Sequence, residues 1–105
     1  MTGLDLTPAP GAAPRARALA AQKGWTGKEW DALYALWNQE SSFRTNAGSP
    51  DHAYGIPQAL PGSKMGSKGK DWRTNPRTQI LWGLDYISGR YGDPIHAQEQ
   101  KRRTD

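Results

Sequence analysis

A stripe of large apolar residues behind a helix start signal constrains the fold of this chain more than any other feature. The stripe recurs at i, i+3, i+4 and i+7, the spacing of one helix face, and consists of Trp30, Leu33, Tyr34 and Trp37. Thr26 and Glu29 have the spacing of a capping box, and Trp25 and Trp30 flank that cap at the positions of a hydrophobic staple. The pattern predicts a helix with one face buried in a tryptophan-rich core.

A further helix is predicted near the C-terminal end. Asn75 is suited to its N-cap, Pro76 to its first position, and Gly92 to its end. Its apolar face consists of Ile80, Leu84, Ile87 and Tyr91. Pro94, two residues after Gly92, also marks the end of this helix.

The chain divides into three parts by composition. Residues 1–13 are rich in Pro, Ala and Gly and are expected to form a linker or tail. Residues 14–97 are expected to form the domain, which opens with a short alanine-rich helix from Pro14 to the stop at Gly24. Residues 98–105 are polar and are expected to fray.

Between the second and third predicted helices lies a long Gly/Pro/Ser-rich segment, residues 45–72. Residues 48–51 read as a turn and residues 53–56 as a short strand. The sequence therefore predicts a mainly α fold with a small β-hairpin or irregular excursion after the second helix. Loops of this length in a compact domain are commonly functional.

Composition excludes several kinds of site. The 105 residues contain no cysteine, which removes disulfides, cysteine-ligated zinc and iron–sulfur clusters. His52 and His96 are too few for a histidine metal centre, so we expect no metal and no cofactor. The net charge of +4 attracts polyanions, whether nucleic acid, anionic cell wall or lipid head groups. No apolar run suits a membrane span, and the first residues carry no signal-peptide pattern.

Glu40 is the strongest candidate for chemistry. It lies three residues after Trp37 and seven after Leu33, so it continues the apolar face of the predicted helix. A carboxylate among indole rings is poorly solvated, and the negative end of the helix dipole also disfavours its charge. Both effects favour a protonated carboxyl group, as a general acid beside a sugar-binding cleft requires. The alternative is a helix-end residue that reaches solvent or pairs with Arg44.

Three ordered motifs resemble the soluble lytic transglycosylase domain of the lysozyme superfamily. Residues 40–43 read Glu-Ser-Ser-Phe, which is similar to the family's Glu-Ser-x-aromatic pattern. Residues 55–58 read Gly-Ile-Pro-Gln, similar to its Gly-x-x-Gln. Residues 75–92 follow its Asn…Ile…Gly-x-x-Tyr…Arg-aromatic-Gly helix. The resemblance covers about residues 25–92 and keeps order and spacing.

This resemblance implies a lysozyme-like α+β domain that cleaves peptidoglycan. Glu40 would act as single general acid and base on the β-1,4 bond between N-acetylmuramic acid and N-acetylglucosamine, leaving 1,6-anhydro ends. The sequences of residues 53–59 and 69–72 resemble those found in actinobacterial wall proteins and in the tail or lysis proteins of their phages.

The resemblance also suggests roles for other residues. Ser49 stands where the family has a serine that contacts the acid or the N-acetyl group, with a plain turn serine as the alternative. Gln58 matches the glutamine whose amide binds saccharide, and Tyr54 and Tyr86 are either sugar contacts or core residues. Asp51 lies in a turn where aspartate commonly caps backbone N–H groups. As a second carboxylate it would instead make the protein a hydrolytic muramidase of the goose-type lysozyme kind.

One departure from the family pattern keeps other functions open. The family usually carries an Ala-x-x-Tyr-Asn-Ala-Gly motif after its last helix, whereas residues 93–97 read Asp-Pro-Ile-His-Ala. A non-catalytic domain that binds cell wall, for example in a phage tail, therefore stays an alternative. A nucleic-acid module is suggested by Lys64, Lys68, Lys70 and Arg73, but aromatic residues do not alternate with this cluster.

The expected partner is the peptidoglycan glycan strand, with no nucleic acid and no integral membrane contact, and the protein is expected to be a monomer. Peptidoglycan lies outside the membrane, so we expect action in the cell wall or from a phage particle. Without a signal peptide, the chain is expected to be a domain of a larger protein or a phage product delivered by another route.

Overall fold

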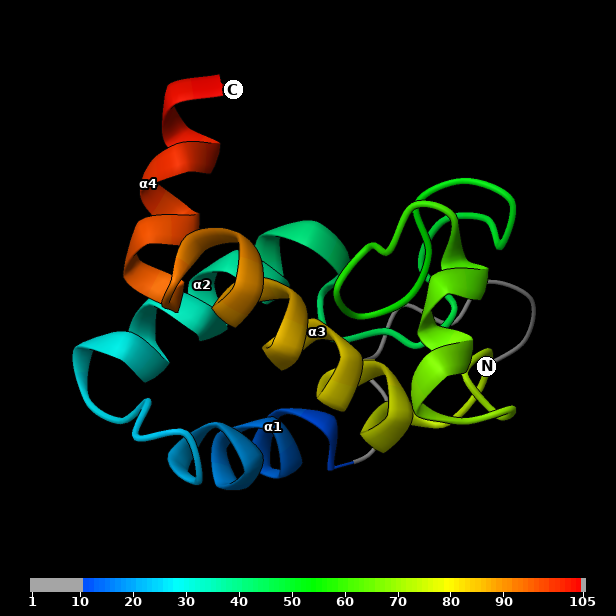
Figure 1. Ribbon diagram of the computed structural model, residues 1–105, viewed down its shortest axis with the longest axis horizontal. Helices are drawn as coiled ribbons and strands as arrows, with labels where there is room; N and C mark the ends of the chain where they lie inside the picture. Colours follow the sequence, from blue (N-terminus) through cyan, green and yellow to red (C-terminus); the bar gives the residue numbers. More distant parts are fainter. Residues whose placement is uncertain (1–10, 105) are drawn as a thin grey trace, which may run out of the picture.

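The computed structural model describes residues 11–104, which form five helices and an irregular segment (Figure 1). The elements follow in the order α1 (Ala12–Ala21), α2 (Lys28–Ser41), the 3-10 helix η1 (Gly62–Lys68), α3 (Pro76–Tyr91) and α4 (Pro94–Thr104). Within the described residues, β pairing is limited to isolated bridges that join Tyr54 to Gly48 and to Ala59. The predicted mainly α fold is confirmed, and the excursion takes the irregular form.

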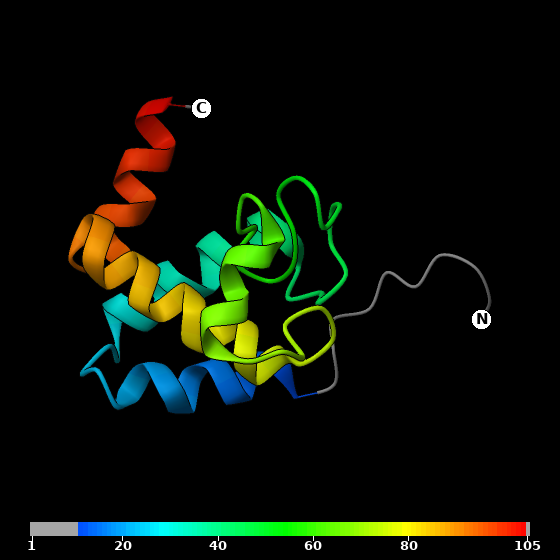
Figure 2. The ribbon, with the colours of Figure 1, turned by 45° about the vertical axis from the view of Figure 1, so that its right-hand side comes forward.

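The excursion occupies one end of the molecule, beside the packed helices (Figure 1). α1 lies along α3, and α4 stands at the opposite end from segment 45–72 (Figures 1 and 2). α2 contacts both α1 and α4, so it runs through the middle of the packing. Among residues 11–104 no helix combines the length and the apolar character that a bilayer span requires.

The tryptophans divide between two buried clusters. The larger cluster takes Trp25, Trp30 and Trp37, together with residues of every α-helix. The smaller cluster is centred on the buried Tyr54, Ala59 and Met65, with Trp72 and Trp82 packed against it. The excursion thus has its own small core, which explains how a Gly/Pro-rich segment is held in place.

Helix α1 begins two residues before the predicted Pro14. Gly11 occupies the N-cap with φ 72°, and its carbonyl accepts the first helical hydrogen bond from Arg15 N–H at 3.0 Å. The buried face consists of Ala12, Ala16 and Ala20, four residues apart, and these small side chains allow close packing on α3. Helix α1 therefore includes two residues, Ala12 and Ala13, that the sequence assigned to the tail, whereas residues 1–10 lie outside the described residues.

The predicted capping box of α2 is wrong. Gly27, at φ 56°, is the N-cap, and no side chain caps the helix. Thr26 contributes only its carbonyl, which accepts from Glu29 N–H at 3.1 Å. The Glu29 carboxylate instead accepts from Ile95 N–H at 3.0 Å, in the first turn of α4. Exposed N–H groups at that helix end and the positive end of its dipole both favour this contact.

The apolar face of α2 is confirmed except at one position. Trp30, Leu33 and Trp37 are buried, whereas Tyr34 is 44% exposed. The buried surface turns toward Leu36 instead, because α4 packs on that side of α2.

Helix α3 is confirmed at both ends. The Asn75 carboxamide accepts from Arg77 N–H at 2.9 Å, and Pro76 follows at the first helical position. The helix ends at Gly92 with φ 90°. The predicted residues Ile80, Leu84 and Ile87 are buried, and Tyr91 packs partly buried against them.

The prediction that residues 98–105 fray is wrong for residues 98–104, which continue helix α4. Asp93 starts the helix, because its carboxylate accepts from His96 N–H at 2.9 Å while Pro94 takes the first position. Ala97 is buried against the larger cluster, and basic residues in the last turn suit the negative end of the helix dipole.

Candidate functional site

A cleft of about 330 Å³ opens where α2, α3, α4 and the excursion meet. Its lining from α2 and α3 is Leu36, Trp37, Glu40, Gly83, Tyr86, Ile87 and Tyr91. The excursion adds Ala53, Pro57, Gln58 and Leu60, and the α4 segment adds Ala97, Gln100, Lys101 and Thr104. The mixture of apolar walls and a few polar groups, and the volume, are typical of a ligand site.

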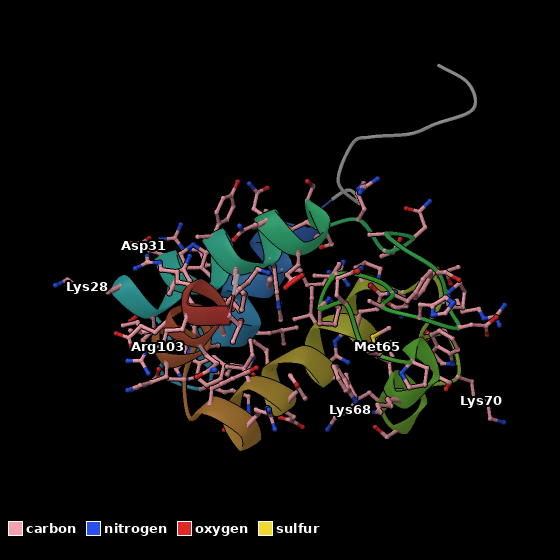
Figure 3. The ribbon with its side chains drawn as sticks, turned by 90° about the horizontal axis from the view of Figure 1, so that it is seen from above. Lys28, Asp31, Met65, Lys68, Lys70 and Arg103 are labelled. Atoms are coloured by element: carbon pink, nitrogen blue, oxygen red, sulfur yellow. The ribbon has the colours of Figure 1, made fainter. Side chains whose placement is uncertain are left out.

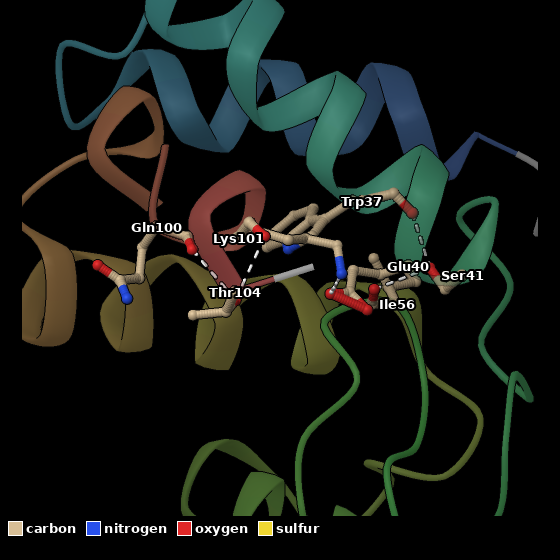
Figure 4. A network of polar contacts seen from close by, with 7 residues as sticks. All are labelled: Trp37, Glu40, Ser41, Ile56, Gln100, Lys101 and Thr104. Atoms are coloured by element: carbon tan, nitrogen blue, oxygen red, sulfur yellow. Dashed lines mark hydrogen bonds and ion pairs between the residues drawn. The ribbon is translucent and has the colours of Figure 1, made fainter. Parts of the chain in front are cut away.

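Glu40 is the carboxylate of this cleft. It is the last but one residue of α2, and its side chain is 30% exposed. Trp37, one turn earlier, is buried beneath it. The Lys101 ammonium from α4 lies 3.4 Å from Oε2 of Glu40, so the carboxylate has a cationic partner (Figure 4). The ion-pair partner of Glu40 is thus Lys101, whereas Arg44 Nε donates to the Ser41 carbonyl at 3.0 Å.

The end of α2 is tied to the excursion by Ser41. Its buried hydroxyl lies 2.8 Å from the Ile56 carbonyl and 3.1 Å from the Trp37 carbonyl, and it accepts from Phe43 N–H at 3.2 Å (Figure 4). These contacts fix the helix end that carries Glu40. Ser41 is therefore a support for the site, and it does not line the cleft.

Close packing beneath the cleft depends on Gly83 of α3. A Cβ atom at this position would lie 2.6 Å from the Trp37 ring and 2.9 Å from Pro57. The missing side chain lets α2 and the excursion approach α3 closely, which brings their lining residues into one cleft.

Aromatic rings form the α3 wall of the cleft. Tyr86 is 43% exposed and stacks on Trp82, with centroids 5.0 Å apart and planes at 11°. Tyr91 meets Tyr86 edge to face at 6.2 Å. Partial burial, and then the neighbouring Tyr91, raise the pKa of Tyr86, so its hydroxyl stays neutral. An exposed ring of this kind can pack against the apolar face of a sugar.

Gln58 lies at the cleft as the sequence predicted, but its amide nitrogen is engaged. Nε2 donates to the carbonyls of Ala47 and Gly55 at 3.1 and 2.9 Å. Gln58 also adopts a positive φ of 55°. The side chain therefore stabilises its own loop.

Three other predicted residues are not among those lining the cleft. Ser49 and Asp51 are exposed in the turn that follows Gly48. Tyr54 is buried in the smaller cluster, where its hydroxyl donates to the Arg73 carbonyl at 2.7 Å and burial raises its pKa. Of the two roles predicted for Tyr54, sugar contact or core residue, its position is that of a core residue.

Sequence reasoning missed the contribution of α4. Lys101 and its neighbours were expected in a frayed tail, yet they form one wall of the cleft. The signal was present in Asp93-Pro94, an N-cap followed by proline, which starts a helix as readily as it ends one. The position of Lys101 opposite Glu40 had no sequence signal, because it depends on how α4 docks on α2.

The basic cluster of the excursion is partly neutralised. Lys68 pairs with Asp85 of α3, which also pairs with Lys23 at 3.0 Å. Lys70 extends outward on the side of the molecule away from Arg103 of α4 (Figure 3). His96 is exposed beside Asp93, at 2.8 Å, and that carboxylate raises the pKa of its ring. No group of three metal-ligating side chains occurs within residues 11–104.

Comparison with known proteins gives one match. A family model described as the transglycosylase SLT domain matches residues 18–99, which span most of the chain and include Glu40, Gln58 and Tyr86. No curated protein and no solved structure matches the chain.

Proposed function

Because the chain belongs to the transglycosylase SLT domain family, we propose that it is a peptidoglycan lytic transglycosylase with Glu40 as its single general acid and base. The bond cleaved is the β-1,4 link between N-acetylmuramic acid and N-acetylglucosamine, and the product carries a 1,6-anhydro ring. The observation that carries this proposal is the cleft itself, in which Glu40 is the one carboxylate among the lining residues that the structure describes.

The reaction needs two proton transfers at the same carboxyl group. Glu40 first gives its proton to the glycosidic oxygen, and the bond from that oxygen to C1 of the muramic acid breaks. The N-acetyl group can stabilise the positive charge that develops at C1. The carboxylate then takes the proton from the C6 hydroxyl, whose oxygen bonds to C1. Glu40 ends the cycle protonated, and no water is consumed.

Glu40 is the only carboxylate among the described residues that line the cleft, and this favours transglycosylation over hydrolysis. An inverting hydrolase needs a second carboxylate across the bond to activate water. Asp51, the candidate for that role, is exposed and does not line the cleft. We therefore rank the goose-type muramidase reaction second.

Tyr86 and Gln58 are the proposed sugar contacts. The Tyr86 ring is exposed at the cleft wall, and its stacking on Trp82 restrains its orientation. Gln58 offers its amide oxygen from a loop that its own nitrogen holds in place. Ser49 and Tyr54 lie away from the lining, so the proposal leaves out the contacts that the resemblance suggested for them.

The substrate sets the proposed place of action. Peptidoglycan lies outside the membrane, so the protein would act in the cell wall, either from the producing bacterium or from a phage particle. The net charge of +4 suits an anionic wall. The actinobacterial or phage origin rests on the sequence resemblance alone, and a monomer is sufficient for the cleft described.

The variant Glu40→Gln tests this function. Wild-type protein should clear a suspension of purified peptidoglycan, and the variant should be slower by at least about a hundredfold. Equal clearing by both would exclude Glu40 as the acid. Binding without clearing by wild type would instead favour the non-catalytic wall-binding alternative.

A further inference from the structure

Lys101 is the basic residue that faces Glu40 in the cleft. Its ammonium lies 3.4 Å from Oε2, and the two side chains are only 23% and 30% exposed (Figure 4). Lys101 lies beyond residues 18–99, so the family match says nothing about it.

The position of Lys101 is fixed by the helix that carries it. Two carboxylates stabilise the start of α4. The Asp93 carboxylate accepts from His96 N–H, and the Glu29 carboxylate accepts from Ile95 N–H. One turn before Lys101, Ala97 is buried against the main core. The ammonium is therefore presented from a docked helix, which distinguishes this pair from an ion pair between two mobile surface side chains.

Few other groups can influence the carboxylate. From α3 the titratable groups facing the cleft are Tyr86 and Tyr91. The excursion contributes only uncharged lining residues. From α4, Gln100 and Thr104 are neutral, and the Thr104 hydroxyl contacts the carbonyls of Gln100 and Lys101 at 3.1 and 3.2 Å (Figure 4). Among the lining residues that the structure describes, Lys101 supplies the one cationic group.

We propose that Lys101 is a positioning residue for the reaction, which holds Oε2 of Glu40 as an acceptor and so leaves Oε1 to carry the catalytic proton. This inference rests on the proposed function. An oxygen that accepts from an ammonium is a poor site for the acid proton, which therefore resides on the other oxygen. The same contact restrains a flexible glutamate side chain toward one orientation in the cleft.

Lys101 keeps its own proton throughout the reaction. The proton on Oε1 passes to the glycosidic oxygen, which leaves with the electrons of its bond to C1. The carboxylate that remains is stabilised by the ammonium on Oε2. Oε1 then takes the proton of the C6 hydroxyl as the new bond to C1 forms, and both residues return to their starting states.

The test compares Lys101→Met and Lys101→Arg with wild type on soluble glycan strands of defined length. Met matches the length and helix propensity of Lys, so α4 should form, and circular dichroism and thermal unfolding confirm that it does. We expect kcat of Lys101→Met to fall roughly tenfold, as for loss of a hydrogen bond to a charged group, with KM changed by less than about threefold. Lys101→Arg, which keeps a cationic donor, should retain most of the activity.

The matched control is Arg103→Met, which removes the same charge from an exposed position of the same helix. It should leave kcat unchanged. An unchanged kcat in folded Lys101→Met would overturn the positioning role, and so would a rise in KM alone, which would make Lys101 a substrate contact only. If Glu40→Gln is inactive while Lys101→Met is normal, this inference fails and the proposed function stands. If Glu40→Gln is active, the proposed function itself fails.

Discussion

The buried side chain of Gln79 accepts a hydrogen bond from the backbone N–H of Ile56 at 2.9 Å, and this bond joins α3 to the loop beside Glu40. The same amide donates to the carbonyls of Thr45 and Trp72 at 3.0 and 2.7 Å. Gln79 is 0% exposed, so water does not share these contacts. One side chain therefore holds the excursion at three points along its length.

Replacement of Gln79 by alanine should destabilise the protein strongly. Gln79→Ala leaves three backbone polar groups without their partner in a buried place, and we expect a loss of about 3 kcal/mol in the free energy of unfolding. Gln39→Ala is the control, because Gln39 is exposed on α2 and its loss should change stability by less than about 0.5 kcal/mol. Equal denaturant midpoints for the two variants would contradict the role given to Gln79.

Gly55 should not tolerate a side chain. Its φ is +80°, and a Cβ atom would lie 2.7 Å from the Gln79 amide, so Gly55→Ala should cost roughly 1–3 kcal/mol through strain and displacement of that side chain. Gly89→Ala offers the opposite case, since Gly89 is within α3 and no atom lies within 4 Å of its added Cβ. That change should stabilise by about 0.5–1 kcal/mol. Thermal unfolding of both variants measures the contrast, and equal changes in the two unfolding temperatures would contradict it.

The ion pairs of Asp85 should give a small stability term that depends on pH. Hydrogen bonds from Lys68 and then Lys23 lower the pKa of Asp85 below its usual value. Because the pKa of Asp85 is lower in the folded than in the unfolded protein, its charge stabilises the fold. This stabilisation is present at a pH above the pKa of an unfolded aspartate, about 3.9, and is lost as the pH falls through the pKa of the folded protein. Because the side chain is 49% exposed, the effect stays under about 1 kcal/mol.

Asp85→Asn measures this term. Wild type should be the more stable protein at pH 7, and the difference should shrink below about pH 4 and in high salt. A difference that stays constant from pH 7 to pH 2 would mean that the variant acts through packing and not through charge.

The Tyr86 ring should matter for binding more than its hydroxyl. Tyr86→Ala removes the exposed ring of the α3 wall, and we expect KM for glycan strands to rise about fivefold or more, whereas Tyr86→Phe should stay near wild type. Tyr34→Ala is the matched control, because Tyr34 is equally exposed but lies on α2 outside the cleft lining. Equal KM values for the Tyr86→Ala and Tyr34→Ala variants would remove Tyr86 from the binding site.

Local patterns predicted those elements whose determinants lie in the element itself. The N-cap and proline at Asn75-Pro76 fixed the start of α3, and the buried face of α2 followed from the spacing of its tryptophans. The predicted capping box does not form, because Gly27 is the N-cap of α2. The Glu29 carboxylate accepts instead from the backbone N–H of Ile95 at the start of α4. That contact joins residues 66 positions apart, so no local rule could predict it.

The sequence predicted Glu40 as the central residue of the site, but not all of the other residues that line the cleft. The helical period brings Glu40 onto the face of Trp37, which is visible in the sequence. The wall opposite Glu40 comes from α4, whose docking depends on the buried Ala97 and on the Glu29 carboxylate of α2. Gln79 was also invisible, because a glutamine in an apolar pattern looks like a surface residue until its three backbone partners are known.

The most direct test of the account is mass spectrometry of the products released from purified peptidoglycan by wild type and by Glu40→Gln. Single-carboxylate chemistry at Glu40 predicts muropeptides with 1,6-anhydro-muramic acid ends, lighter by one water than the hydrolytic products, from wild type alone. Reducing ends from wild type, or anhydro ends from both proteins, would contradict it.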